Sequence, residues 1–513
     1  MPTGEELTEE RRLKRDRLKQ GGKEPYPYGF PDRTPMASVR QELQGQAPGG
    51  ELSGVVRRVA GRLLTVRQHG KTAFLPLRDQ TGELQLFLRV DDLGEDSYRQ
   101  VLETIDPGDL VGAEGVPMVT RRGEPSVRAT SVVLLAKSLR PPPEKWHGLQ
   151  DTEARLRQRY VDLLSSAETL RRFEARSALV TEMRRYLGSQ GFMEVETPVL
   201  GRVASGGLAH PFLTHYRFLE EDFRLRVALE LPLKRLLVGG FERVFEIGKV
   251  FRNEDLDADH SPEFTMMELY WAYADYTDVR RLVEGLTEDL AKVAAPFLSK
   301  EEAEARIRDF TPPYPTIDYV EALEKESGIP DIVDLPRERL VALARECGAK
   351  VHEGMSHGAA LDKVFGHYVE AKLDRPTFVL DYPVETTPLA KRHRSKPGRV
   401  ERFELFYKGI ELGNAYSELN DPDDQEARFR EQLPPPSRTG AHEEEETYAY
   451  DEDFVEALRY GMPPAGGLGM GVDRLLMAML GASSIKDVIL FPPTRAKAGS
   501  TTPSPAPTPS SSK

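Results

Sequence analysis

The segment RFELFYKGIELGNAYSEL, residues 402–419, sets three glutamates seven positions apart among apolar and aromatic side chains. Its YKG triplet can form a turn between two strands. A hairpin centred between Tyr407 and Lys408 would make Glu404 and Glu411 cross-strand partners, about 5 Å apart at Cβ. Adjacent carboxylates repel unless a cation joins them, and Mg²⁺ bound to carboxylates and substrate phosphates would do so. Two exposed glutamates on a surface hairpin are the alternative.

A second candidate, VFRNEDLDADHSPEFTMMELY at residues 250–270, combines arginine, glutamate and aromatic side chains. Arg252 and Glu254 alternate along an expected strand and would point the same way. An arginine fork matches phosphate oxygens, and a nearby aromatic ring can stack on a base. Nucleotide binding is therefore one interpretation, and an Arg–Glu pair on a hairpin is the other.

A third stretch, GGLGMGVDRLLMAML at residues 466–480, places glycines directly before an expected apolar helix. Glycines allow a backbone to approach a ligand closely. Arg474 lies in the first turns of that helix, where a buried guanidinium needs an anion or a carboxylate partner. A ligand phosphate and a structural salt bridge are the two interpretations. Because the chain contains no GxxxxGK[ST] loop and no GxGxxG after a strand, any nucleotide site must rely on side chains.

Length and composition indicate an ordinary globular protein of two or three domains. The chain has 513 residues, of which 39% are apolar and 30% charged, and it is too long for one core. No apolar run is long enough to span a bilayer, and the charged N-terminus is unlike a signal peptide. The single cysteine, Cys347, excludes an internal disulfide and favours a cytoplasmic protein.

The charge of the chain is distributed unevenly. The net charge of −13 argues against a generic nucleic-acid coat. Residues 51–90 differ, because seven basic side chains stand there against three acidic ones, a local charge of +4. A basic, strand-rich segment of this kind is either a nucleic-acid module or a solvated sheet face.

Local patterns divide the chain into four parts. Residues 1–50 indicate an exposed charged helix followed by a linker. Short strands over 51–145 predict a small β-barrel that ends in a Pro-rich linker. Residues 146–495 mix helices and strands without regular alternation, which favours an α+β domain with an antiparallel sheet flanked by helices. We expect the tail at 496–513 to be disordered, and a polar insertion at 431–446 to be a mobile loop.

Together the three segments resemble signature motifs of class II aminoacyl-tRNA synthetases. GFMEVETPVL, an expected strand ending at Pro198, resembles motif 1, the segment VFRNE to HSPEFTMME resembles motif 2, and GLGMGVDR resembles motif 3. Longer stretches are similar to bacterial lysyl-tRNA synthetases: HGLQDTEARLRQRYVDLL, LKRLLVGGFERVFEIGKVFRNE, PEFTMMELYWAYADY and ELGNAYSELND. The resemblance covers roughly residues 50–495.

The resemblance implies a lysine–tRNA ligase, which joins L-lysine to tRNA(Lys) through a lysyl-adenylate made from ATP with Mg²⁺. It implies an oligonucleotide-binding barrel (OB-fold) for the anticodon, a class II antiparallel sheet for catalysis, and a homodimer formed through motif 1. The lysine carboxylate would attack the α-phosphorus directly, so no general base is assigned. Catalysis would then depend on Arg252, Arg474 and Mg²⁺.

The resemblance also implies a role for individual positions, with Arg252 at the α-phosphate, Arg474 at the γ-phosphate and Glu418 at the ε-ammonium of lysine. The positions matched to ATP binding are Arg252, Glu254, His260, Phe264, Glu404 and Arg474. Those matched to lysine binding are Gly206, Glu230, Arg252, Glu268, Tyr270, Asn414, Tyr416 and Glu418. Those matched to magnesium are Glu404 and Glu411. Those matched to the anticodon are Arg67, Phe74, Gln85 and Glu124, with Phe74 as a stacking ring.

Four positions depart from the family pattern. Asp255 stands where the family usually has glycine, and Asp259 where it often has a basic residue before the motif 2 histidine. Both lie in the loop that normally approaches ATP and the tRNA acceptor end. His210 replaces a common arginine, and Pro232 replaces an aromatic residue in an expected first helical turn, where proline is tolerated.

Three other functions remain open on the sequence. An aspartyl- or asparaginyl-tRNA synthetase shares the architecture but needs a cationic or amide-reading pocket, whereas Glu230, Glu268 and Glu418 favour a cationic substrate. A protein-modifying paralogue would lack the anticodon barrel. A non-catalytic RNA-binding protein on the same fold would need neither the two arginines nor the magnesium pair.

Overall fold

A computed structural model describes residues 4–142, 151–203, 206–207, 209–352, 354–431 and 450–495. The chain divides into two compact units, Met1–Arg155 with Tyr160–Ser165, and Leu156–Arg159 with Ser166–Lys513. The loop expected at 431–446 lies outside the described residues from 432 onwards, and the tail expected at 496–513 lies outside them entirely. Each unit is therefore described by itself.

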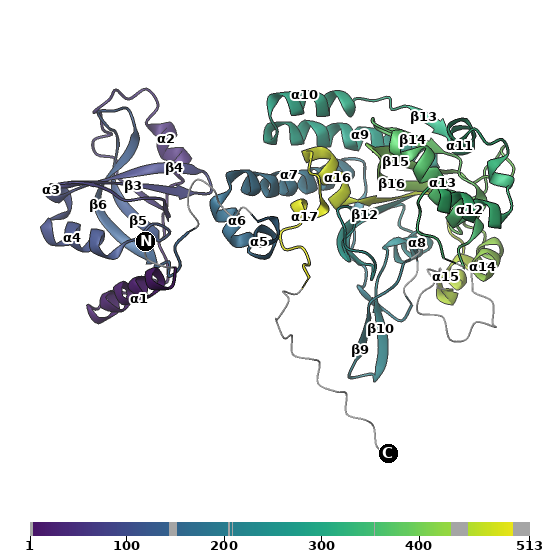
Figure 1. The fold of residues 1–513 in the computed structure, drawn as a ribbon, viewed down its shortest axis with the longest axis horizontal. Helices are drawn as coiled ribbons and strands as arrows, with labels where there is room; N and C mark the ends of the chain where they lie inside the picture. Colours follow the sequence, from purple (N-terminus) through teal and green to yellow (C-terminus); the bar gives the residue numbers. More distant parts are fainter. Residues whose placement is uncertain are drawn as a thin grey trace, which may run out of the picture. The chain divides into compact units, whose positions relative to one another are not determined.

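The first unit contains a closed five-stranded barrel with one short added strand (Figure 1). The order around the barrel is β1-β5-β6-β4-β3, β3 pairs back onto β1, and β2 extends from β3. Only β4 and β6 pair in parallel. The predicted β-barrel is confirmed, with the OB-fold that the resemblance implied. Its strands are β1 (Arg57–Leu63), β2 (Arg67–His69), β3 (Thr72–Asp79), β4 (Gly82–Arg89), β5 (Leu110–Val119) and β6 (Pro125–Ala136).

Alternating apolar residues produce the core of the barrel. Leu84, Leu86 and Leu88 of β4 are buried, and so are Leu75 and Leu77 of β3, because residues two apart share one face of a strand. Three short helices complete the fold: α2 (Met36–Glu42), α3 (Val90–Leu93) and α4 (Glu95–Thr104).

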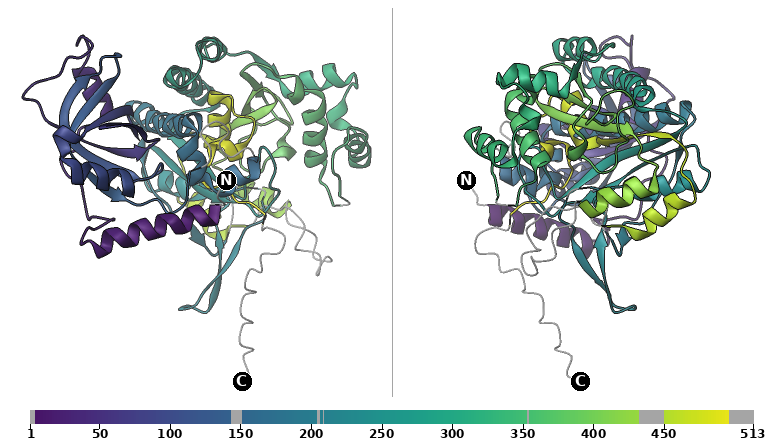
Figure 2. Two further views of the ribbon diagram at one scale, coloured as in Figure 1. Left: turned by 60° about the vertical axis from the view of Figure 1, so that its left-hand side comes forward. Right: turned by 90° about the vertical axis from the view of Figure 1, so that its right-hand side faces the viewer.

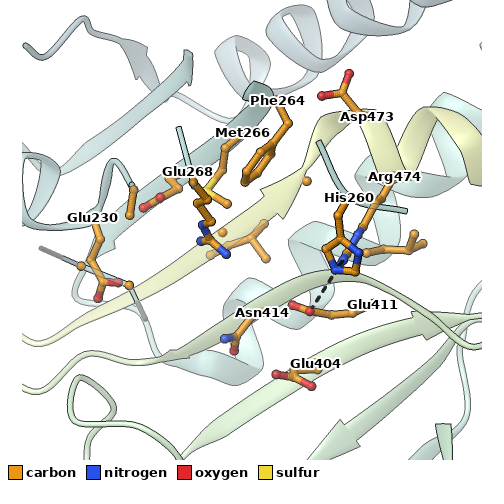
Figure 3. A pocket seen from close by; sticks show the side chains of 18 of the residues that line it. Glu230, His260, Phe264, Met266, Glu268, Glu404, Glu411, Asn414, Asp473 and Arg474 are labelled. Atoms are coloured by element: carbon orange, nitrogen blue, oxygen red, sulfur yellow. Dashed lines mark hydrogen bonds and ion pairs between the residues drawn. The ribbon is translucent and has the colours of Figure 1, made fainter. Parts of the chain in front are cut away.

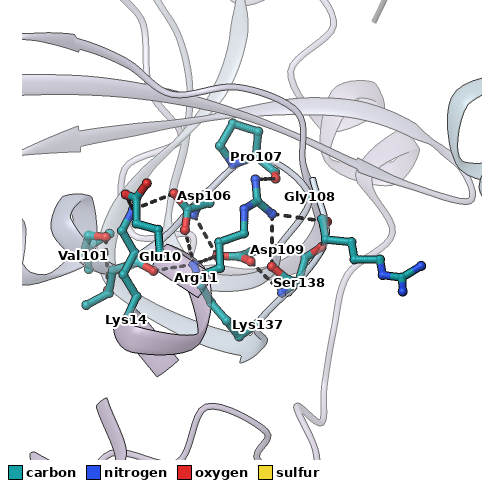
Figure 4. Close-up of polar contacts among 12 residues, drawn as sticks. Glu10, Arg11, Lys14, Val101, Asp106, Pro107, Gly108, Asp109, Lys137 and Ser138 are labelled. Carbon is teal, nitrogen blue, oxygen red and sulfur yellow. Dashed lines mark hydrogen bonds and ion pairs between the residues drawn. The ribbon is translucent and has the colours of Figure 1, made fainter. Parts of the chain in front are cut away.

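The N-terminal helix α1 (Gly4–Gln20) is anchored to the barrel (Figure 4). Arg11 is only 7% exposed, and its guanidinium donates to the carbonyl oxygens of Pro107 and Ser138, both at 3.0 Å. The predicted helix is confirmed. The prediction that it is exposed is wrong for the face that carries Arg11, because carbonyl groups far along the chain satisfy this charge.

The second unit is built on an eight-stranded sheet of order β13-β14-β15-β16-β17-β12-β11-β7. Pairs in the centre are antiparallel, as predicted, and the two outermost pairs, β13–β14 and β11–β7, are parallel. The strand expected to end at Pro198 is much shorter than predicted. The strands of the eight-stranded sheet are β7 (Met193–Glu194), β11 (Arg243–Phe251), β12 (Glu263–Ala272), β13 (Thr316–Asp318), β14 (Thr377–Leu380), β15 (Arg402–Tyr407), β16 (Ile410–Ser417) and β17 (Ala465–Gly471).

A small second sheet of order β8-β10-β9 stands beside the large one in the same unit. Its strands are β8 (Leu200–Gly201), β9 (Leu213–Tyr216) and β10 (Glu221–Leu225). Its pairs are antiparallel, and β9 and β10 form a hairpin whose side chains are largely exposed.

Hydrophobic cores cover both faces of the large sheet, and Figure 2 shows its strands enclosed between helices. Alternate residues of β12 enter different cores, since Met267 and Leu269 pack with α7, α9 and α16, whereas Tyr270 packs with α8 and α13. One side of β12 thereby carries Glu268 and Tyr270 together. The helices named here are α7 (Ala167–Ser189), α8 (Glu230–Val238), α9 (Tyr276–Ala294), α13 (His357–Tyr368) and α16 (Val472–Leu480).

Shorter helices complete the described chain, and none of the described helices combines the length and apolar character needed to cross a membrane. The α-helices are α5 (Thr152–Arg157), α6 (Arg159–Ser165), α10 (Lys300–Asp309), α11 (Tyr319–Ser327), α12 (Arg337–Glu346), α14 (Pro422–Glu431), α15 (Glu452–Arg459) and α17 (Ile485–Val488). The 3-10 helices are η1 (Ala295–Phe297), η2 (Ile332–Asp334), η3 (Glu370–Lys372) and η4 (Val384–Thr386).

Candidate active site

A cavity of about 310 Å³ opens in the second unit beside β12, β16 and β17 (Figure 3). Its walls come from the β11–β12 loop, the β15–β16 hairpin and the start of α16. The three sequence segments therefore meet in one cavity. The candidate residues that line it are Gly206, Glu230, Arg252, Glu254, His260, Phe264, Glu268, Tyr270, Glu404, Glu411, Asn414, Tyr416 and Arg474.

The turn of the β15–β16 hairpin lies one residue later than predicted. Tyr407 pairs with Ile410, so the two turn residues are Lys408 and Gly409. Their φ angles are both positive, 52° and 73°, as a tight two-residue hairpin turn requires, and glycine adopts such angles without strain. The predicted centre between Tyr407 and Lys408 is therefore wrong.

A β-bulge brings Glu404 and Glu411 to a common side. The register shifts between Leu405 and Phe406, so that Glu411 pairs with Phe406 and Glu404 pairs with Asn414. The predicted direct pairing of Glu404 with Glu411 is thus wrong. One extra residue on β16 offsets the strand alternation, and for this reason Glu411 and Asn414 face the same cavity although their numbers differ in parity.

Glu404 is buried and bonded at both carboxylate oxygens. Its Oε2 accepts from the Tyr382 hydroxyl at 2.6 Å, and its Oε1 pairs with the Arg402 guanidinium. Burial raises the pKa of Glu404 to about 7, with Arg402 opposing the rise and Glu411 adding to it. Burial, Glu404 and Glu411 also raise the pKa of Glu370 to about 8. This end of the cavity is therefore an environment of excess negative charge.

The same carboxylates fit a divalent cation that is shared with a ligand. Within the described ranges, no group of three or more His, Cys, Asp or Glu side chains is arranged to hold a metal. Glu404 and Glu411 would leave most of the octahedral shell of Mg²⁺ to phosphate oxygens and water, which is its usual arrangement. Such a cation would lower the raised pKa values of Glu404 and Glu370, because positive charge favours the ionised form.

Arg474 reaches the cavity from the first turn of α16. Its Nη1 lies 3.5 Å from Glu411 Oε2, and its Nη2 lies 2.9 Å from His260 Nε2 (Figure 3). The preceding residue, Asp473, anchors the helix, since its carboxylate accepts from the Thr265 amide at 2.7 Å and from the Arg176 guanidinium at 2.5 Å. Sequence reasoning missed this anchor, although the adjacent Asp and Arg in the third segment were visible.

Arg252 and Glu254 lie just beyond a strand and not along it, because β11 ends at Phe251. The predicted alternation along a strand is therefore wrong, yet both residues line the cavity. The Arg252 guanidinium stands 5.4 Å from the centre of the Phe264 ring, and its Nε donates to the Val227 carbonyl at 3.3 Å. Arginine and ring thus form one face of the cavity.

The β11–β12 loop holds His260 against Arg474. Asp257 accepts from the His260 backbone amide at 2.8 Å and stands 3.0 Å from its Nδ1. The unusual Asp259 contributes its carbonyl oxygen to Arg474 Nε at 3.4 Å. Asp255 forms a solvent-exposed pair with Lys350, at 3.6 Å. Asp255 and Asp259, which both depart from the family pattern, nevertheless line the cavity.

The opposite end of the cavity is acidic and buried. Glu268 accepts from the Leu229 amide at 2.8 Å and from the Tyr270 hydroxyl at 2.9 Å. Glu230 accepts from the Tyr416 hydroxyl at 2.8 Å. Burial, with the Glu230 charge second, raises the pKa of Glu268 to about 8. A cation that entered here would meet carboxylates shielded from water.

Lys234 is the residue at this end that sequence reasoning missed. Its Nζ lies 2.6 Å from Glu230 Oε1 and 2.5 Å from Glu418 Oε2. Burial works to lower the pKa of Lys234, but Glu230 and Glu418 raise it above its usual value. The signal was present in ALELPLKR, because residues four apart on a helix are neighbours. Nothing local indicated that Glu418 would join the pair.

Glu418 does not line the cavity, because it lies beneath it. Only 1% of the residue is exposed, and burial raises the pKa of its carboxyl to about 8, an effect that Lys234 opposes. A Cβ on Gly467 would overlap the Glu418 carboxylate and stand 2.6 Å from the Tyr270 ring. Position 467 therefore requires glycine, because its backbone packs closely over the Glu418 carboxylate.

Two further predicted residues lie beside these carboxylates. Gly206 has φ of +90°, and a Cβ there would stand 3.3 Å from the Glu230 Cβ, so its backbone borders the acidic end. Asn414 accepts from Arg402 Nε at 3.1 Å through its Oδ1. That bond orients the amide between the acidic end and the Glu404 end.

The barrel collects three of the four predicted anticodon residues on one face. Arg67 pairs across strands with Phe74 and donates to Gln85 Oε1 at 3.1 Å. The Phe74 ring stacks on Phe87, with centroids 5.1 Å apart and planes at 16°. Glu124 lies in the exposed β5–β6 turn and is linked to Gln85 through Ser126, whose hydroxyl accepts from Gln85 Nε2 at 3.0 Å and donates to the Glu124 carbonyl at 3.1 Å. Sequence reasoning missed Phe87, although it follows Gln85 at strand spacing.

Comparisons with known protein families agree with this two-unit organisation. Residues 151–495 match the family described as tRNA synthetases class II (D, K and N). Residues 57–135 match the OB-fold nucleic acid binding domain. The two matches coincide with the sheet that carries the cavity and with the barrel.

Individual relatives match nearly the whole chain. A lysine–tRNA ligase of Dehalococcoides mccartyi is 46% identical over 493 residues, covering 95% of this chain and 97% of that protein. One of Moorella thermoacetica is 45% identical over 481 residues, covering 94% and 96%. One of Deinococcus radiodurans is 46% identical over 490 residues, covering 93% and 91%.

Proposed function

Since this chain belongs to the class II tRNA synthetases, we propose that it is a lysine–tRNA ligase. It would use ATP to convert L-lysine into lysyl-adenylate and pyrophosphate, and would then transfer the lysyl group to the 3′ end of tRNA(Lys). The observation that carries the choice of lysine is the buried acidic end of the cavity, formed by Glu230, Glu268 and Glu418.

Charge balance at that end supports a substrate that carries two ammonium groups. Three carboxylates stand there against the single ammonium of Lys234. The two ammonium groups of lysine would neutralise the remainder. Aspartate would bring a carboxylate into this environment, and asparagine would leave buried carboxylates without a counter-charge, so both should be rejected.

The opposite end would bind the triphosphate and position it for attack. Arg252 would hold the α-phosphate, with Phe264 stacked on the adenine, and Arg474 would bind the γ-phosphate end. A lysine carboxylate oxygen would then form a bond to the α-phosphorus while the bond from that phosphorus to pyrophosphate breaks. The carboxylate is already ionised, so the step needs positioning and charge stabilisation but no general base.

Glu404 and Glu411 would hold Mg²⁺ beside this end. The ion would neutralise charge on the phosphates. Support comes from the raised pKa of Glu404, about 7, and from the Glu411 charge that contributes to it. The role of Arg402 is then to keep Glu404 ionised and oriented, through the ion pair between them.

The barrel would recognise the anticodon through stacking. Phe74 and Phe87 present a pair of parallel rings, and Arg67 and Gln85 beside them supply polar groups. Because charged tRNA is consumed in translation, we expect the protein to work in the cytoplasm.

A homodimer through the motif 1 region is also proposed. Apolar side chains near Pro198 are exposed in the single chain, including Met193 (55%), Val199 (38%) and Leu200 (49%). An exposed group of this kind is typical of a subunit contact. Analytical ultracentrifugation at micromolar concentration should give the mass of two chains, and a monomer would contradict this part of the proposal.

Aminoacylation tests the function as a whole. Purified protein should incorporate labelled lysine into acid-precipitable tRNA(Lys) with ATP and Mg²⁺, and should leave tRNA(Asp) and tRNA(Asn) uncharged with their own amino acids. Incorporation of aspartate or asparagine would assign the chain to another member of the family. No incorporation with any of the three would contradict ligase activity.

A further inference from the structure

Lys234 occupies a position where a cationic side chain is unexpected. Its side chain is fully buried beside a cavity that, on the proposed function, takes a cationic substrate. Its ammonium bridges two carboxylates from different elements, Glu230 on α8 and Glu418 just after β16. A resident cation there repels an incoming ammonium, so a compensating role is needed to account for it.

We propose that Lys234 is a positioning residue that sets the spacing and the ionisation of the two carboxylates that receive the substrate's ammonium groups, and thereby selects lysine by length. This inference rests on the proposed function, because it assigns the α-ammonium to Glu230 and the ε-ammonium to Glu418.

The geometry gives the bridge little freedom. The Lys234 ammonium stands 5.5 Å from the centre of the Tyr416 ring and 5.9 Å from that of Phe454, and both contacts favour a cation at this point. Tyr416 in turn donates to Glu230 at 2.8 Å. The oxygen of each carboxylate that faces Lys234 is thus fixed. The other oxygen of Glu230, which lines the cavity, is left for a ligand, whereas the other oxygen of Glu418 lies under the Gly467 backbone at the cavity wall.

Charged and titratable groups around Lys234 explain why ionisation depends on it. Glu268 and Tyr270 of β12 stand near Glu230 and Glu418, and Arg252 acts on Glu268 from the cavity. From α15 and the residue before it, Asp451 and Asp453 pair with Arg235. The Lys234 ammonium opposes the rise in the pKa of Glu418, so without it three buried carboxylates would lack their resident counter-charge and would keep protons up to still higher pH.

Selection by length follows from the same bridge. With Glu230 and Glu418 held by one ammonium, the distance between the two substrate ammonium sites is fixed. Ornithine is one methylene shorter than lysine and would fail to reach both sites. Once the bridge is lost, the carboxylates can move, and discrimination between the two amino acids should fall.

The test compares Lys234→Met, which removes the charge at similar volume, with Lys234→Arg, which keeps it. Lysine-dependent and ornithine-dependent ATP–pyrophosphate exchange would be measured between about pH 6.5 and 8.5. The matched control is Lys137→Met in the barrel, because Lys137 is equally buried and is bonded to Asp109 at 2.8 Å. Folding of each variant would be verified by circular dichroism.

For Lys234→Met we expect the KM for lysine to rise about tenfold or more, with the KM for ATP within about twofold of wild type. That KM should fall more steeply with rising pH than in wild type, since substrate binding must expel a proton. Preference for lysine over ornithine should decrease. Lys234→Arg should keep the wild-type pH profile, and Lys137→Met should leave the KM for lysine unchanged.

A purely structural role predicts a different pattern. If Lys234→Met and Lys234→Arg raise the KM values for lysine and ATP in parallel, with the wild-type pH profile and the wild-type preference over ornithine, the inference is overturned. Where Lys234→Met does not fold, Lys234→Arg decides, because a changed pH profile in a variant that keeps the charge contradicts the proposal. Absence of lysine-dependent exchange in wild type would instead reject the proposed function.

Discussion

The two ends of the cavity use the same residue types in opposite environments. At the phosphate end, the side chains of Arg474 and Glu411 are 25% and 39% exposed, and they contact each other at 3.5 Å. At the acidic end, the side chains of Lys234 and Glu230 are 0% and 6% exposed, and they stand 2.6 Å apart. The Arg474–Glu411 pair is thus partly open to water, whereas the Lys234–Glu230 pair is enclosed by protein.

On the proposed function, this difference corresponds to what each end would bind. A triphosphate with Mg²⁺ carries several charges, so solvated arginines and carboxylates suffice to hold it, and the nucleotide is the same throughout the family. A single ammonium group contributes little binding energy in water. In a desolvated site, however, a side chain that leaves a carboxylate unpaired is rejected, because an unpaired buried charge is costly. Burial is therefore concentrated where the amino acid is chosen.

The largest effect is expected at the buried end, from Glu418→Gln. Loss of one partner of a buried ion pair costs about 3–5 kcal/mol, and the same loss of lysine binding would be a fall of about two to four orders of magnitude in kcat/KM for lysine. ATP–pyrophosphate exchange measures it. Glu301→Gln, at an exposed position of α10, is the control and should match wild type. Near-normal activity of Glu418→Gln would remove this carboxylate from the lysine site.

At the open end, Arg474→Ala should act mainly on ATP. Loss of a charge-stabilising donor costs about 10² to 10³ in rate, and kcat/KM for ATP should fall accordingly while the KM for lysine stays within about twofold. Arg474→Lys should recover part of the activity, because a point charge remains. An equal rise in both KM values would mean that Arg474 supports the fold, as a structural salt bridge would.

The barrel lies outside this comparison and provides a reference for it. In Phe74→Ala, the loss of stacking on one base costs about 1–3 kcal/mol, so the KM for tRNA(Lys) in aminoacylation should rise by a factor of about 5 to 150. Lysine-dependent exchange should be unchanged, because neither end of the cavity is touched. A matching loss of exchange would show that the barrel affects activation as well.

Glu411→Gln sharpens the assignment of the metal to the open end. The concentration of Mg²⁺ for half-maximal exchange should rise about tenfold, since a ligand charge is lost. The KM for lysine at saturating Mg²⁺ should stay at the wild-type value. An unchanged Mg²⁺ requirement would contradict the role of this carboxylate.

The smallest effect concerns pH and the buried end. Folding raises the pKa of Glu268 and of Glu418 to about 8, so their contribution to stability is present at low pH and is lost as the pH rises towards that value. Lysine supplies the missing positive charge. Its stabilisation of the protein in thermal unfolding should therefore be larger at about pH 8 than at about pH 6, whereas norleucine, without the ε-ammonium, should give no such increase. A larger shift at the lower pH would contradict this.

Sequence and structure agree best where local chemistry decides. Arginines within phosphate-binding patterns, glutamates among apolar residues and a glycine-rich strand each identified a side of the cavity. The cross-strand partner of Glu404 was not predictable, because a bulge on β16 changes the register and no residue in the segment indicates that bulge. The prediction that both carboxylates belong to one site rested on their hairpin, and in the structure the bulge is what turns Glu411 to the same cavity as Glu404.

Lys234 shows a second reason why the site could not be predicted fully from the sequence. Its spacing from Glu230 is visible in the sequence, but its second partner, Glu418, comes from a distant strand, and only the packing of α8 against the sheet brings them together. The prediction that α1 is exposed was wrong at Arg11 for the same reason, since the partners of Arg11 lie far along the chain. Contacts between distant segments decide burial, and burial decides what a charge does.

Amino-acid selection by the buried end is tested most directly by ATP–pyrophosphate exchange of the wild-type protein with Mg²⁺, measured separately with lysine, aspartate and asparagine. We predict exchange with lysine alone, because only lysine adds a side-chain ammonium to the α-ammonium that all three amino acids bring to Glu230, Glu268 and Glu418. Exchange with aspartate or asparagine at a comparable rate would contradict the assignment of these carboxylates to substrate selection.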